Sequence, residues 1–182
     1  IIGNEANLKF VDFNGDGKID IYAAPYSDTT VYGFGAIFMN NGSSFTRTNI
    51  NFGADIGAHD SAIYDFNNDG KMDLLTLNYG TNISMSLGNG NGTFSEQAAA
   101  YGLAEKRLTM NASFFDYDRD GDLDIFLITN PADEMVSGIN IIRDRSVQGE
   151  SRGTDILYRN NGDQTFTDVS REAGILIEGY SL

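Results

Sequence analysis

Three nine-residue stretches carry oxygen-bearing side chains at alternate positions. They read DFNGDGKID at 12–20, DFNNDGKMD at 65–73 and DYDRDGDLD at 116–124. Side-chain oxygens at positions 1, 3, 5 and 9, together with a backbone carbonyl at position 7, can converge on one hard cation. A glycine at position 6 permits the sharp bend that this convergence requires. The pattern therefore indicates metal binding by oxygen ligands.

The predicted ligands follow one register in all three stretches. They are Asp12, Asn14, Asp16, the carbonyl of Lys18, and Asp20; Asp65, Asn67, Asp69, the carbonyl of Lys71, and Asp73; and Asp116, Asp118, Asp120, the carbonyl of Asp122, and Asp124. Ligation by oxygen alone favours Ca²⁺, because Mg²⁺ loses its water reluctantly, and zinc and copper prefer His or Cys. The chain has one His and no Cys. We expect about three structural Ca²⁺ ions.

Two other interpretations compete with a calcium site. Clusters of Asp, Asn and Gly also form ordinary turns. Three copies in one register favour the metal, because crowded carboxylates repel one another unless a cation screens them. An EF-hand is excluded, because it requires Glu at position 12 between two helices. Ala23, Thr76 and Leu127 occupy that position, and the flanking segments are strand-like.

The loops recur in a repeat of about 50 residues. Asp12, Asp65 and Asp116 are 53 and 51 residues apart, and an Asn/Gly turn that runs into Phe recurs between them. The flanking segments, such as LKFVDF and IDIYAA, are rich in aromatic and β-branched residues at strand length. Four strands in such a repeat match one β-propeller blade. We predict an all-β fold, a propeller segment of about three to three and a half blades within a larger propeller.

The predicted organisation is one partial propeller over residues 1–182 with no second domain. Repeat 1 covers about 8–50, repeat 2 about 60–103, and repeat 3 about 111–175 with an insertion at 131–154. Helical signal is confined to 95–108 and 170–175, where a turn or two is expected. We also expect the apolar residue at position 8 of each loop to anchor that loop to the core. These residues are Ile19, Met72 and Leu123.

Composition narrows the classes of partner. The net charge is −14 and the pI is about 4.2, which argues against nucleic acid and anionic membranes, since both attract basic surfaces. No stretch approaches the roughly 18 apolar residues of a membrane span. The chain begins IIGNEANLKF without a Met and shows no signal segment. We therefore expect it to be a piece of a longer polypeptide from which any targeting segment is missing.

With these features together, the chain resembles the FG-GAP/VCBS repeat family, whose blades are similar to those of the integrin α-subunit propeller. Residues 114–130 and 157–175 resemble the repeats of ASPIC/UnbV-type proteins and cartilage acidic proteins. The resemblance covers nearly the whole chain outside 131–154. It implies a secreted or surface-displayed, calcium-loaded propeller, usually of seven blades, that acts in adhesion or binds glycans or proteins. All loop ligands carry over, and Asn at position 3 of two loops implies slightly weaker binding there.

Three classes of function remain open. The favoured class is a module for adhesion or for binding glycans or extracellular proteins, without catalysis. The second is a structural subunit that contacts neighbouring subunits in an extracellular assembly or filament. The third is a propeller-fold polysaccharide lyase or hydrolase, for which His59 and the insertion arginines Arg143, Arg145 and Arg152 are the candidate groups. No convincing catalytic set is visible, so we expect no enzyme activity.

Overall fold

The computed structural model describes residues 8–24, 35–50, 58–78, 83–103, 109–129 and 147–178. Within these ranges twelve strands form three antiparallel four-stranded sheets, each in the order of its strands along the chain. The strands are β1 (Leu8–Val11), β2 (Asp20–Ala23), β3 (Gly35–Asn40), β4 (Phe45–Ile50), β5 (Ala58–Tyr64), β6 (Asp73–Asn78), β7 (Ser84–Gly88), β8 (Phe94–Glu96), β9 (Thr109–Phe115), β10 (Asp124–Thr129), β11 (Ile156–Asn160) and β12 (Phe166–Asp168). The predicted all-β propeller segment is confirmed.

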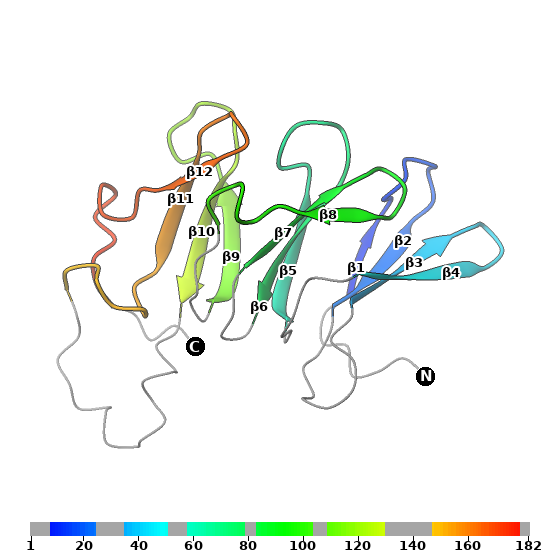
Figure 1. The fold of residues 1–182 in the computed structure, drawn as a ribbon, viewed down its shortest axis with the longest axis horizontal. Helices are drawn as coiled ribbons and strands as arrows, with labels where there is room; N and C mark the ends of the chain where they lie inside the picture. Colours follow the sequence, from blue (N-terminus) through cyan, green and yellow to red (C-terminus); the bar gives the residue numbers. More distant parts are fainter. Residues whose placement is uncertain are drawn as a thin grey trace, which may run out of the picture.

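The three sheets stand side by side as consecutive blades (Figure 1). The loops β1–β2, β5–β6 and β9–β10, which carry the acidic stretches, all lie along the same edge, at the top of the view. Each blade thus presents its acidic loop at the same place. The described part of the chain contains no helix with the length and hydropathy of a membrane span.

The two segments with helical signal form isolated turns instead of helices. Tyr101 donates its backbone N–H to the carbonyl of Gln97 at 3.0 Å, and Ala173 donates to Val169 at 2.9 Å. Each turn closes at a glycine with positive φ, Gly102 or Gly174. A left-handed residue ends a helix because it redirects the chain, so neither turn extends. Residues 104–108 of the first segment lie outside the described residues.

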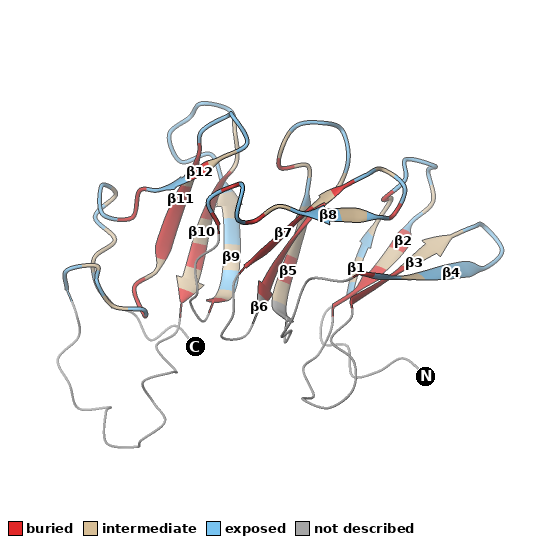
Figure 2. Ribbon diagram, in the orientation of Figure 1, coloured by how far each residue is buried: buried red, intermediate tan, exposed pale blue. Residues whose placement is uncertain are grey.

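Two buried apolar clusters join the sheets, and Figure 2 shows the buried residues on facing strands. Side chains alternate between the two faces of a strand, so neighbouring residues of β6 serve different blades. Leu74 packs with Tyr22 and Ile37 of the first blade, whereas Leu75 packs with Ile125 of the third. The central blade is therefore covered on both faces, and its strand β6 accordingly carries leucines on both faces.

An aromatic residue at position 2 of the first and second acidic loops connects its blade to the next one. The ring of Phe13 meets that of Phe94, the residue after the Asn/Gly turn of the second blade, edge to face at 5.7 Å. Phe66 occupies the same loop position and lies in one buried cluster with Phe166 of the third blade. The acidic loops thus contribute to packing between blades through a residue that is not a predicted ligand.

The prediction that position 8 anchors every loop is wrong for Ile19, which is 52% exposed. Met72, its counterpart, packs against the cluster of the preceding blade. Ile19 belongs to the face of the first sheet that carries Phe10, which is 62% exposed, and the described residues place no sheet against that face. Burial at position 8 therefore depends on a neighbouring blade and is not built into the loop.

Candidate metal centre

The position-1 aspartate organises each acidic loop by accepting backbone hydrogen bonds. Asp12 Oδ2 accepts from Gly17 N at 2.8 Å, and Asp65 Oδ2 accepts from Gly70 N at 2.7 Å. These glycines have φ of 81° and 83°, in the left-handed region that side chains with a Cβ rarely adopt. The bend predicted at position 6 is thus present, and it turns the chain back towards the first carboxylate.

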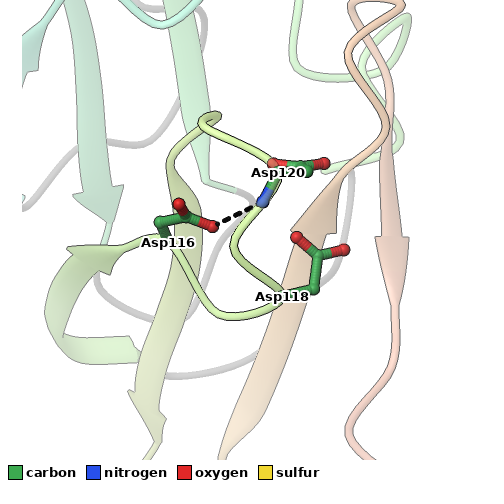
Figure 3. Close-up of side chains that lie close together, drawn as sticks. All are labelled: Asp116, Asp118 and Asp120. Atoms are coloured by element: carbon green, nitrogen blue, oxygen red, sulfur yellow. Dashed lines mark hydrogen bonds between the residues drawn. The ribbon is translucent and has the colours of Figure 1, made fainter.

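The third loop brings three carboxylates together (Figure 3). Asp116, Asp118 and Asp120 each offer an oxygen, and these oxygens all lie within 4.8 Å of one another. Asp120 donates its backbone N–H to Asp116 Oδ1 at 3.1 Å, the bond that Figure 3 marks. All three residues are exposed, so an ion from solvent can reach them. The structure therefore gathers the predicted ligands at positions 1, 3 and 5.

In the first two loops the position-5 carboxylate is paired with a lysine of its own loop. Lys18 Nζ lies 2.8 Å from Asp16 Oδ2, and Lys71 Nζ lies 3.0 Å from Asp69 Oδ2. The hydrogen bond from each lysine side chain lowers the pKa of its aspartate partner. A positive charge within the chain thus stands beside one predicted ligand in each of these loops.

The position-7 side chain of each loop lies over the glycine of the Asn/Gly turn in the same blade. Lys71 Cδ is 3.1 Å from the point that a Cβ would take at Gly90, and in the third blade Asp122 Oδ2 is 3.0 Å from the corresponding point at Gly162. Asp122 also accepts a hydrogen bond from Asn68 Nδ2 at 3.3 Å. This bond links the second and third loops across the boundary between blades.

The position-9 aspartate is fully buried in every blade and accepts hydrogen bonds from two backbone amides. We call this arrangement the clasp. One amide belongs to the residue after position 1 of the loop, and the other closes the third strand of the blade. The bonds are Phe13 N and Asn40 N to Asp20, Phe66 N and Gly88 N to Asp73, and Tyr117 N and Asn160 N to Asp124. Burial raises the pKa of Asp73 and of Asp124. Each clasp therefore holds the loop onto the sheet without an ion.

The donor chemistry of the loops fits Ca²⁺. The groups that converge in the third loop are carboxylate oxygens, and the first two loops offer carboxylate and amide oxygens at the same positions, all of which suit a hard cation. The position-9 carboxylates also remain compatible with a metal, because each carboxylate oxygen has a second lone pair beyond the one used by the amide. Ligation by these aspartates and by the carbonyls of Lys18, Lys71 and Asp122 stays a prediction.

Tyr101 lies next to the second loop, although it comes from the turn after β8. Its ring is buried and packs against Phe166 at 6.4 Å between centroids. Burial raises the pKa of Tyr101, and the charges of Asp73 and Asp69 in the second loop raise it further. Its hydroxyl has no hydrogen-bond partner among the described residues. No sequence pattern reveals this neighbour, because about 30 residues separate it from the loop.

Two of the features that sequence reasoning missed had a visible signal. The Phe at position 2 of the first two loops marks the contact between blades, and the Lys at position 7 of the same loops marks the internal ion pairs. Of the candidate catalytic groups, His59 lies on β5 and Arg152 lies in the turn before β11. Arg143 and Arg145 fall outside the described residues, as does most of the 131–154 insertion.

Comparison with models of known protein families agrees with the repeat architecture. The model of the FG-GAP-like repeat matches residues 12–76 and 65–127, which together make up more than half of the chain. Among solved structures, the chain is similar to an Agrocybe aegerita lectin that recognises non-reducing terminal N-acetylglucosamine, with 20% identity and a TM-score of 0.48. That alignment covers 88% of this chain and 36% of the lectin chain. No protein of curated function matches in sequence. This chain belongs to the FG-GAP-like repeat family.

Proposed function

We propose that this chain is a calcium-stabilised β-propeller module of an exported protein, and that the module binds glycans or proteins outside the cell. The observation that supports it is the repetition of one oxygen-donor loop at the same edge of three consecutive blades. In the third of these loops, three carboxylates lie within 4.8 Å of one another. Such a cluster is unfavourable unless a cation neutralises it.

Calcium acts as a structural ion in this proposal. The loop leads directly into β2, β6 or β10, and position 9 is the first residue of that strand. An ion held by positions 1, 3 and 5 fixes the loop against the strand that the clasp already holds. Because a bound ion stabilises only the folded state, calcium raises the free energy of unfolding.

The proposed location follows from the affinity that such loops have. Calcium sites of extracellular modules bind with Kd of about 10⁻⁴–10⁻³ M, so they fill outside the cell and stay largely empty inside it. The resemblance of residues 114–130 and 157–175 to ASPIC/UnbV-type repeats and cartilage acidic proteins agrees with this location. Binding without catalysis is the activity we propose for the module.

Calorimetric titration and thermal melting test the calcium step. The intact protein, dialysed against chelator, is titrated with CaCl₂ and with MgCl₂, and we expect calcium alone to raise Tm. Asp120→Ala is expected to remove one bound ion, whereas Asp163→Ala, an exposed aspartate outside the loops, leaves the stoichiometry unchanged. A wild-type protein whose Tm is the same in chelator and in calcium contradicts the structural ion.

A glycan array and a set of purified extracellular matrix proteins test the binding step. The calcium-loaded protein is expected to bind a defined glycan or protein, and chelator is expected to weaken that binding. Incubation with polysaccharides is expected to release neither reducing ends nor unsaturated ends. Release of such ends points instead to a lyase or hydrolase, and a His59→Ala variant then shows whether the lone histidine contributes.

A further inference from the structure

The side chain at position 7 divides the three acidic loops into two kinds. Lys18 and Lys71 place an ammonium group 2.8 Å and 3.0 Å from the position-5 carboxylate of their own loops. The third loop has Asp122 at this position. Among the described residues, no cationic side chain lies within ion-pair distance of a carboxylate of the third loop.

The charge carried by each loop differs accordingly. Residues 12–20 and 65–73 each contain three aspartates and one lysine, a formal charge of −2. Residues 116–124 contain five aspartates and one arginine, a formal charge of −4. Position 3 adds to the contrast, since Asn14 and Asn67 are neutral whereas Asp118 is charged. The third loop therefore attracts a divalent cation most strongly and has the greatest repulsion without one.

The side chains of Lys18 and Lys71 are placed so that they can move away from the position-5 carboxylate. Their stems lie against the turn of the same blade: Lys18 Cε is 3.5 Å from the Cβ position of Gly42, and Lys71 Cδ is 3.1 Å from that of Gly90. Both side chains are exposed, at 41% and 43%. A rotation of the outer carbons moves the ammonium from the carboxylate into solvent without disturbing buried groups.

We propose that Lys18 and Lys71 are internal counter-ions, which neutralise position 5 in the metal-free protein and move away when Ca²⁺ binds. The third loop has no such counter-ion and is the tightest calcium site of the three. This inference rests on the proposed function, because it requires Ca²⁺ to bind the loops. It assigns the lysine side chains a role distinct from that of their carbonyls, which are the predicted ligands.

Each lysine weakens its own site in two ways. The incoming ion must replace an existing ion pair, and the ammonium repels the ion until it has moved away. Exposed ion pairs are individually weak, so we expect the two effects to lower affinity by about three- to tenfold per loop. Calcium should therefore fill the third loop first.

Calorimetric titration of the intact, chelator-treated protein with CaCl₂ tests this order. The wild-type protein is expected to show one tighter site and two weaker ones. Lys18→Met with Lys71→Met keeps stems of similar length and is expected to tighten the two weaker sites by about three- to tenfold. Asp122→Lys introduces a counter-ion and is expected to weaken the tight site. Lys9→Met is the matched control, because Lys9 pairs with Asp60 on β5, away from the loops.

A second measurement needs no calcium. In chelator at low salt, the double lysine variant is expected to melt below the wild-type protein, and the difference should disappear at about 1 M salt, which screens exposed ion pairs. If that variant does not fold, Asp122→Lys still tests the inference when it is compared with Asp122→Leu, because both substitutions remove the hydrogen bond from Asn68 and only the lysine adds a counter-ion.

The outcomes separate the inference from the proposal on which it rests. Calcium binding with the same affinities in the lysine variants, Asp122→Lys and the wild-type protein overturns the counter-ion role and leaves the calcium module intact. Absence of any calcium binding by the wild-type protein overturns both. A tighter third site that weakens in Asp122→Lys, with tighter first and second sites in the double lysine variant, establishes the counter-ion role.

Discussion

Asp20 accepts the backbone N–H of Asn40 at 2.7 Å, and through this bond the start of β2 holds the end of β3. The other oxygen of the same carboxylate accepts Phe13 N at 2.9 Å. The second and third blades repeat the arrangement at Asp73 and Asp124. The ninth position of the acidic motif thus stabilises the sheet directly, whereas the first, third and fifth positions, which are predicted metal ligands, lie in the loop ahead of the strand. Substitutions at position 9 and at positions 1, 3 and 5 can test whether these roles are separate.

Asp73→Ala is expected to destabilise the metal-free protein by about 2–4 kcal/mol, because it leaves the buried amides of Phe66 and Gly88 without an acceptor. Asp118→Ala, in the exposed part of the third loop, is expected to leave the metal-free stability unchanged or slightly higher, since it removes a repelling charge. Urea unfolding in chelator measures both. Equal destabilisation by the two substitutions contradicts the separation of clasp and ligand positions.

Tyr22→Phe is expected to cost about 1–2 kcal/mol, because the Tyr22 hydroxyl and Ser61 Oγ form a buried hydrogen bond at 3.1 Å between two blades. Tyr101→Phe is the matched control. Its hydroxyl has no hydrogen-bond partner among the described residues, so its removal should change stability by less than about 0.5 kcal/mol. Thermal unfolding of both variants in chelator provides the comparison. A larger loss of stability in Tyr101→Phe than in Tyr22→Phe contradicts a stabilising hydrogen bond between Tyr22 and Ser61.

Gly88→Ala is expected to destabilise the second blade strongly. A Cβ at this position would lie 2.2 Å from the carbonyl oxygen of Met72, a contact with backbone that no rotamer change relieves. Gly15→Ala is the control, because nothing lies within 4 Å of its Cβ position and only its φ of 71° disfavours alanine. We expect Gly15→Ala to lower the free energy of unfolding by about 1–2 kcal/mol, because alanine is strained in the left-handed region. Gly88→Ala should lower the free energy of unfolding by more than Gly15→Ala does. Denaturant midpoints of the two variants measure the difference.

Phe66→Ala is expected to destabilise the protein by about 3–5 kcal/mol, as is usual for the loss of a buried aromatic ring. Phe66 is 4% exposed and its ring lies 5.1 Å from that of Phe114 on the next blade. Tyr117 stands at the same loop position in the third blade but is 40% exposed. Tyr117→Ala is therefore expected to cost about 1 kcal/mol or less. Comparable losses for the two variants in urea unfolding contradict the blade-to-blade role of Phe66.

Local features of the fold were predictable from the sequence. The strands beside each acidic loop follow from their β-branched and aromatic residues, and the bend follows from the glycine at position 6, because each depends on a few consecutive residues. Convergence of Asp116, Asp118 and Asp120 likewise follows from their alternate spacing within one loop. The turn at 97–103 was expected in the same way, although its length was set by the glycine that ends it.

Tertiary structure decided which groups these residues meet. The clasp at Asp20 uses a backbone amide from a distant strand, and since every residue except proline has such an amide, no sequence pattern marks it. Ile19 and Met72 share one loop position, yet only Met72 is covered, because burial depends on the neighbouring blade. The sequence by itself determined the repeat, the strands and the oxygen donors, which are encoded within short segments. The fold decided the role of each aspartate, because packing between distant segments determines its partners.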